Sequence, residues 1–145
     1  MIVLDTNILL YAYNPSFAQH EAARTWLEQT LGHPSPVGLP WSTIMAFLRI
    51  STNPRAFPRP LTPGEAVDIV AGWLAHPTVL IIQPGERHWE ILQGVLLAAQ
   101  ARGPQVMDAH LAALTIEHGA VLCTTDRSFR LFAGLRTRNP LEGSP

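Results

Sequence analysis

The sequence predicts an α/β domain built on a parallel sheet. Short apolar segments that resemble buried strands alternate along the 145 residues with longer segments of helical periodicity. Hydrophobic residues make up 47% of the chain and charged residues 14%, which is enough apolar material for one core. The one cysteine, Cys123, excludes a disulfide framework. With no repeat or linker in view, we expect a single domain over residues 1–140 and a loose tail over 141–145.

Capping residues and prolines divide the first half of the chain. Residues 2–5 form an apolar run that ends in a carboxylate, as a buried strand does. Thr6 and Asn7 can cap a short helix after this strand, whereas Asn53-Pro54 ends a later helix, because the residue before a proline avoids helical geometry. The other elements predicted here are a helix over 19–31, a strand over 37–39 and a helix from Ser42 or Thr43 to residue 52.

The second half of the chain begins with a strong helix signal. Thr62-Pro63-Gly64-Glu65 is a capping box with proline at the first helical position. In the helix that follows, to about Ala75, we expect Val67, Val70 and Leu74 to face the core. The remaining predicted elements are strands over 78–82, 120–124 and 135–137, helices over 86–102 and 108–118, and a short helix from Asp126 to Phe132.

Three aspartates are expected to meet at one edge of this sheet. A helix over 108–118 and a strand over 120–124 each span about 16 Å, so Asp108 and Asp126 fall at the same edge. Asp5 ends the first strand and points to that edge if the sheet is parallel. Any one of these carboxylates could simply cap a helix. All three at one edge favour a functional site.

Carboxylates that converge repel one another unless they are protonated or neutralised by a cation. Oxygen ligands of this kind suit Mg²⁺ or Mn²⁺, which keep several bound waters. Such an ion activates water and stabilises the charge that develops at a phosphodiester during hydrolysis. Asp5, Asp108 and Asp126 are therefore the candidate catalytic residues and metal ligands, and Mg²⁺ or Mn²⁺ is the expected cofactor.

The order of these motifs resembles that of PIN-domain ribonucleases. Residues 2–7, Ile-Val-Leu-Asp-Thr-Asn, resemble the opening of that family, residues 108–120 its third acidic motif, and residues 124–129 its fourth. The stretch from Trp41 to Arg55 resembles one branch of the VapC toxins of type II toxin–antitoxin systems. The resemblance covers nearly the whole chain, and the ordered set is more specific than its first motif alone.

The resemblance implies a three-layer α/β/α sandwich with a mainly parallel sheet. It also implies a Mg²⁺- or Mn²⁺-dependent endoribonuclease that acts on cellular RNA, such as tRNA or rRNA, and it places Asp5, Asp108 and Asp126 on the acidic positions of the family. The partners it implies are a second copy in a homodimer and a VapB-type antitoxin that covers the active groove. Because no apolar run is long enough for a membrane helix and no secretory signal is present, we expect a cytoplasmic protein.

Two positions depart from the acidic pattern of the family. Ala46 stands where a glutamate is frequent, and Ser128 where a second aspartate is frequent, so a second metal ion would be poorly held. An alternative is therefore a catalytically weak module that binds RNA or an antitoxin without cutting. A phosphatase with Asp5 as nucleophile is a third reading, which Asn7 disfavours because such enzymes usually carry an aspartate there.

A locally basic segment suggests where RNA could bind. No acidic residue lies between Glu28 and Glu65, and three arginines lie in the latter half of that interval. Trp41 could stack on a base or belong to the core, and His110, which points away from Asp108 on a helix, is expected to pack. The candidate substrate contacts are Thr6, Asn7, Arg49, Arg55, Arg127 and Ser128.

Overall fold

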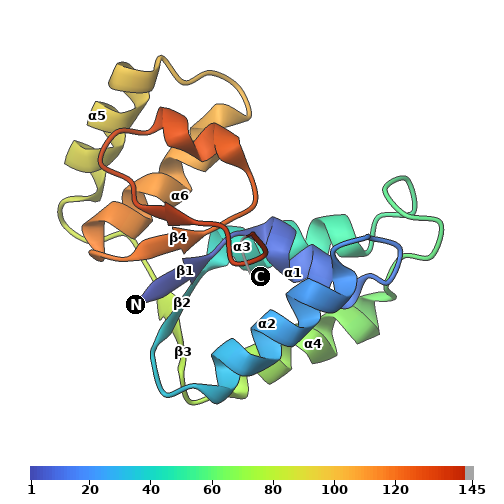
Figure 1. Ribbon diagram of the computed structural model, residues 1–145. Coiled ribbons are helices and arrows are strands. Elements are labelled where there is room, and N and C mark those ends of the chain that lie inside the picture. Colours follow the sequence, from blue (N-terminus) through green and yellow to red (C-terminus); the bar gives the residue numbers. More distant parts are fainter. Residues whose placement is uncertain (143–145) are drawn as a thin grey trace.

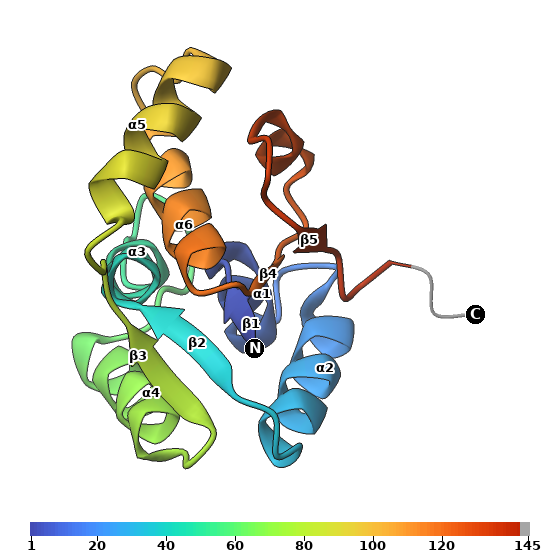
Figure 2. The same cartoon turned by 90° about the vertical axis from the view of Figure 1, so that its left-hand side faces the viewer.

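The computed structural model describes residues 1–142 and contains a five-stranded sheet in the order β3-β2-β1-β4-β5 (Figure 1). Each of the four strand pairings is parallel. The strands are β1 (Ile2–Leu4), β2 (Val37–Pro40), β3 (Val79–Ile82), β4 (Val121–Cys123) and β5 (Thr137–Arg138). Helices cover both faces, and the predicted three-layer α/β/α class is confirmed (Figure 2).

Alternation along the strands supplies two apolar cores, one on each face of the sheet. In β1, Leu4 packs into the first core and Val3 into the second, because successive side chains of a strand point to opposite faces. In β4, Cys123 and Leu122 divide in the same way. The first core is covered by α1 (Thr6–Tyr13), α2 (His20–Gly32), α3 (Trp41–Ser51) and α4 (Pro63–Ala75), and the second by α5 (His88–Ala99), α6 (Gln105–Glu117) and the 3₁₀ helix η1 (Arg127–Leu131).

The helix α4 begins as the sequence predicts. The Thr62 hydroxyl accepts a hydrogen bond from the Glu65 amide at 3.1 Å, and the Glu65 carboxylate accepts one from the Thr62 amide at 3.0 Å. Both bonds satisfy amides that have no partner within the helix, and the bond from the Thr62 amide to the carboxylate lowers the pKa of Glu65. The buried face of α4 agrees with the prediction at Val70 and differs from it at Val67 and Leu74. Val67 is 58% exposed and Leu74 41%, while Trp73 is buried beside Val70.

Several predicted boundaries are wrong by a few residues. Asp5, not Thr6 or Asn7, is the N-cap of α1. The helix α5 ends at Ala99 because Gln100 adopts a left-handed conformation with φ of 51°, well before the predicted end at Arg102. The helix α6 begins at Gln105, so Asp108 lies within its first turn and does not cap it. The last strand, β5, covers Thr137–Arg138, so it begins two residues later and ends one residue later than the predicted strand over 135–137.

The chain end after β5 contacts the domain as far as it is described. Leu141 packs against the first core, and the Glu142 carboxylate lies 3.3 Å from the exposed Arg127 guanidinium. Residues 143–145 of the predicted tail lie outside the described residues, and the division at residue 140 stays a prediction. Within residues 1–142, no helix combines the length and the apolar character needed to cross a membrane.

Candidate active site at the carboxyl edge of the sheet

Asp5 is held where β1 ends and α1 begins. Because β1 and β4 pair with Leu4 opposite Cys123, Asp5 lies beside Thr124, and its amide donates to the Cys123 carbonyl at 3.1 Å. One carboxylate oxygen, Oδ1, accepts a hydrogen bond from the Thr6 amide at 2.7 Å. The other, Oδ2, accepts one from the Thr124 hydroxyl, also at 2.7 Å. Asp5 is therefore fixed in orientation and only 8% exposed.

Asp126 follows β4 and is tied to the same threonine. Its amide donates to the Thr124 hydroxyl oxygen at 3.0 Å, and its Oδ1 accepts a hydrogen bond from the Ser128 amide at 2.9 Å, which caps η1. The Thr124 hydroxyl thus donates to Asp5 and accepts from Asp126. Sequence analysis missed this role of Thr124, although a threonine two residues before an aspartate at a strand end is a visible signal.

Asp108 reaches the site from the first turn of α6. Within residues 1–142 its carboxylate accepts no hydrogen bond, in contrast to those of Asp5 and Asp126. Asp108 lies in the N-terminal turn of α6, where the helix dipole favours negative charge. Asp108 is therefore free of structural partners and able to bind a ligand.

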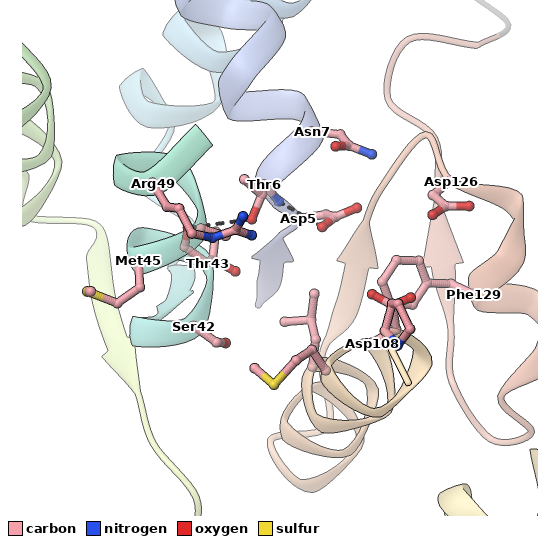
Figure 3. A pocket seen from close by; sticks show the side chains of 14 residues that line it. Asp5, Thr6, Asn7, Ser42, Thr43, Met45, Arg49, Asp108, Asp126 and Phe129 are labelled. Carbon is pink, nitrogen blue, oxygen red and sulfur yellow. Dashed lines mark hydrogen bonds between the residues drawn. The ribbon is translucent and has the colours of Figure 1, made fainter. Parts of the chain in front are cut away.

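The three carboxylates line one cavity of about 800 Å³ (Figure 3). Asp5 comes from the end of β1, Asp108 from α6 and Asp126 from the segment after β4, and Arg49 reaches in from α3 on the opposite side (Figure 3). Polar and apolar side chains complete the lining around the three carboxylates and Arg49. The cavity is lined by Asp5, Thr6, Asn7, Ser42, Thr43, Met45, Ala46, Arg49, Pro104, Met107, Asp108, Leu111, Asp126 and Phe129.

Three of the candidate substrate contacts do not line this cavity. Arg55 lies on the exposed loop after α3, where its amide donates to the Asn53 side chain. Arg127 lines a smaller neighbouring cavity that also includes Asp126, and it pairs with Glu142. Ser128 contributes its backbone amide to Asp126. Thr6, Asn7 and Arg49 are the candidates that lie beside the carboxylates.

Burial and nearby negative charge raise the pKa of two of the carboxylates, Asp5 and Asp108. Burial raises the pKa of Asp5, and the negative charges of Asp108 and Asp126 raise it further, against the hydrogen bonds from Thr124 and Thr6. Burial and the charge of Asp126 also raise the pKa of Asp108. A raised carboxyl pKa means that the ionised form is disfavoured where it stands. A cation bound beside them would offset this cost by stabilising the ionised form of both groups.

The chemistry of the donors fits Mg²⁺ or Mn²⁺, because the titratable side chains facing the cavity are carboxylates and one arginine. Among residues 1–142 no three His, Cys, Asp or Glu side chains are close enough together to enclose an ion directly. The arrangement therefore suits an ion held by one or two carboxylates and otherwise by water, as Mg²⁺ usually is. Ala46 lines the cavity and adds no fourth carboxylate.

The geometry thus places three carboxylates in one cavity whose chemistry fits a hydrated divalent ion. Residues 2–135 match the PIN domain family, and the chain belongs to that family. It is 39% identical to Ribonuclease VapC37 of Mycobacterium tuberculosis, covering 97% of either chain. It is 38% identical to VapC ribonuclease Mb2897 of Mycobacterium bovis, covering 99% of this chain and 97% of the relative.

A solved structure supports the fold independently of close sequence similarity. The crystal structure of VapBC2 from Rickettsia felis, bound to a DNA fragment from their promoter, contains a chain that superposes with a TM-score of 0.68 at 18% identity. The superposition covers 96% of this chain and 98% of the other. At that level of identity the similarity concerns the fold.

Proposed function

We propose that this protein is a VapC-type endoribonuclease toxin that hydrolyses phosphodiester bonds of cellular RNA in the cytoplasm, with Mg²⁺ or Mn²⁺ as cofactor. The observation that carries the proposal is the presence of Asp5, Asp108 and Asp126, from three distant parts of the sequence, in one cavity. The names of the relatives, ribonucleases 34–39% identical over nearly the full chain, support the same activity. A tRNA or an rRNA is the substrate class we expect.

The proposal assigns roles to the three aspartates, to Thr124 beside them and to Arg49. Asp5, Asp108 and Asp126 would hold the ion, one or two of them directly and the others through its bound water, and the ion would supply an activated water and stabilise negative charge at the scissile phosphate. Thr124 orients Asp5 and fixes the backbone at Asp126. Arg49 faces the carboxylates across the cavity, where a guanidinium can pair with phosphate oxygens that are not bound to the ion (Figure 3).

The test is cleavage of total RNA by the purified protein in Mg²⁺ or Mn²⁺. Asp5→Asn is expected to slow cleavage by at least about 100-fold, because it removes a charge used at the reacting centre. Asp68→Asn, at an exposed position of α4 outside the cavity, is the matched control and should cut like the unmodified protein. Equal cleavage by the Asp5→Asn protein, or no cleavage in any condition, would contradict the proposal.

We also propose that a VapB-type antitoxin segment covers this cavity and that the toxin is a homodimer. The cavity combines carboxylates with apolar walls, and Met45 and Met107 on its rim are each 58% exposed. A peptide with both basic and apolar side chains fits such a surface. Co-expression with the small protein encoded next to the gene should give a complex that no longer cuts RNA. Failure of any such protein to associate or inhibit argues against this partner.

A second candidate function is a PIN-like module that binds RNA or an antitoxin without cutting. Its support is that Ala46 lines the cavity where the family resemblance would place a glutamate. In that case the unmodified protein binds RNA without a divalent ion and leaves it intact, and combining Ala46→Glu with Ser128→Asp creates cleavage. Cleavage by the unmodified protein decides against this candidate.

A further inference from the structure

A second cavity adjoins the carboxylate cavity at the same edge of the sheet. It has a volume of about 260 Å³ and lies between the start of α3, the end of β3 and α6. Ser42 lines both cavities, so a ligand in one lies next to a ligand in the other. The lining residues that matter here are Trp41, Ser42, Ile82, Pro84, His110 and Leu114.

The chemistry of this second cavity differs from that of the first. Every residue of its lining is apolar or neutral, apart from the titratable ring of His110. Trp41, the first residue of α3, is 49% exposed although it is a large aromatic side chain. The sequence left open whether Trp41 belongs to the core or stacks on a base, and its exposure rules out a fully buried core position.

The segment after β3, which contributes Gln83 and Pro84 to the cavity lining, is held in place by side chains at the end of α6. The Glu117 carboxylate accepts hydrogen bonds from the Gly85 amide at 2.8 Å and the Arg87 amide at 3.0 Å. A Cβ added at Gly85 would come within 2.6 Å of a Glu117 oxygen, so a larger residue there would displace this carboxylate. His118 Nε2 lies 3.0 Å from the Gln83 carbonyl. The segment that carries Pro84 is therefore anchored to the end of α6.

His110 is connected to the end of α6 through His88. His88 Nε2 lies 3.0 Å from His110 Nδ1, and His88 Nδ1 lies 4.0 Å from a Glu117 oxygen. A proton on His88 Nδ1, which faces the carboxylate, makes His88 Nε2 the acceptor for a proton on His110 Nδ1. His110 Nε2 then remains as a hydrogen-bond acceptor for a ligand. The prediction that His110 is only a packing residue is incomplete, because its ring also lines the cavity.

We propose that this cavity is a nucleobase subsite, in which one base of the RNA chain stacks on Trp41 while its phosphate occupies the neighbouring carboxylate cavity. A base is flat, uncharged and polar only at its edge, which matches an exposed indole, apolar walls and one acceptor nitrogen. A volume of 260 Å³ lies below the range of sites for larger ligands and suits a single heterocycle. The subsite rests on the proposed ribonuclease function, because the phosphate is assigned to the first cavity.

The first experiment does not depend on cleavage. The chain has four tryptophans, and their indole N–H signals in an NMR spectrum can be followed while each of the four ribonucleoside 5′-monophosphates is added at millimolar concentration. The signal missing in the Trp41→Phe variant belongs to Trp41. We expect it to shift with the nucleotides and not with ribose 5-phosphate, which lacks the base. The signal of Trp89, 66% exposed on α5, should not move.

A second arm asks whether the base comes from RNA. In an Asp5→Asn background, a single-stranded oligoribonucleotide should shift the Trp41 signal at lower concentration than free nucleotides do. A matching abasic oligomer should not shift it. His110→Phe is expected to weaken nucleotide binding about two- to ten-fold, as loss of one hydrogen bond does, and unchanged binding overturns the role of His110.

The third readout uses the activity. Trp41→Ala is expected to raise KM for RNA roughly 5- to 150-fold with a smaller change in kcat, because stacking contributes to binding. Trp89→Ala is the matched control and should leave both constants unchanged. If the unmodified protein does not cut RNA, the proposed function fails while the NMR titration still decides the subsite.

Two results would overturn the subsite. One is a Trp41 signal that stays in place, or that moves equally with ribose 5-phosphate. The other is a Trp41 signal that responds to an antitoxin and to no nucleotide, which would assign this cavity to a protein contact.

Discussion

The hydroxyl of Thr124 connects two of the three carboxylates. It donates to Asp5 Oδ2, which belongs to a buried side chain, and accepts from the Asp126 amide, which is partly buried. Replacing this hydroxyl with a methyl group would leave Asp5 Oδ2 without its partner at a site where Asp5 is 8% exposed. A buried acceptor without a partner is costly, so the effect should reach both stability and chemistry.

We predict that Thr124→Val lowers the free energy of unfolding by about 1–3 kcal/mol and slows RNA cleavage by more than about 10-fold. Chemical denaturation and initial cleavage rates measure the two effects. Thr125→Val is the matched control, because no hydrogen bond of the Thr125 side chain is found within residues 1–142. If both variants behave alike, Thr124 has no special role.

Asp108 gives a prediction about pH. Its pKa is raised in the folded protein by burial and by Asp126, so the ionised group destabilises the fold at neutral pH. That cost is present above the raised folded pKa, decreases as pH falls through it, and disappears below the ordinary pKa of 3.8 in the unfolded chain. Asp108→Asn should therefore stabilise the metal-free protein at neutral pH.

Because Asp108 is partly exposed, we expect a gain of less than about 1 kcal/mol. Thermal unfolding of both proteins in a chelator, over a pH series from neutral to acidic, should show the two midpoints converging as pH falls. A variant that is less stable at neutral pH, or a difference that grows in acid, would contradict this account.

For individual residues, the sequence predicted those positions in the site that follow from the direction of the strands and helices. Asp5 and Asp126 lie at one edge because parallel strands end there, and Asp108 joins them because α6 begins at that edge. The side-chain hydrogen bonds of Thr124 were not predictable, because they depend on the register between β1 and β4 and on a rotamer. For similar reasons, the pairing of His110 with His88, 22 residues away, left no pattern in the sequence.

Among the elements, α4 shows how much a local signal determines. Its capping box is visible in four consecutive residues and is formed in the structure. We predict that Thr62→Ala destabilises the protein by about 1 kcal/mol, since a lost N-cap typically costs that much. Chemical denaturation of Thr62→Ala, Glu65→Ala and the double variant measures it. Strictly additive effects would contradict a reciprocal pair.

Helix faces and ends were predicted less well because tertiary packing decides them. In α4, periodicity alone favoured Val67 and Leu74 for the core, but the buried position is taken by Trp73, which donates to the Tyr13 hydroxyl at 2.9 Å. The end of α5 depends on Gln100, a non-glycine residue in a left-handed conformation that no breaker residue announces.

For the whole molecule, the acidic cavity predicts a link between metal and stability. Mg²⁺ or Mn²⁺ that binds only the folded chain should raise its thermal midpoint. At a free ion concentration of a hundred times the dissociation constant, the free energy of unfolding should increase by about 2.7 kcal/mol. The increase should be reversed by chelator and be smaller in Asp108→Asn. A midpoint that both ions leave unchanged in the unmodified protein would contradict a metal site formed by these carboxylates.

The hydrogen bond between Thr124 and Asp5 joins residues 119 positions apart in the sequence. During synthesis, Asp5 leaves the ribosome long before the residues that orient it, and β1, which lies between β2 and β4, has only one neighbour until β4 arrives. The acidic cavity therefore cannot assemble on a nascent chain that ends before Val121, because β4, Thr124 and Asp126 are still missing. A translation product truncated there should not cleave RNA.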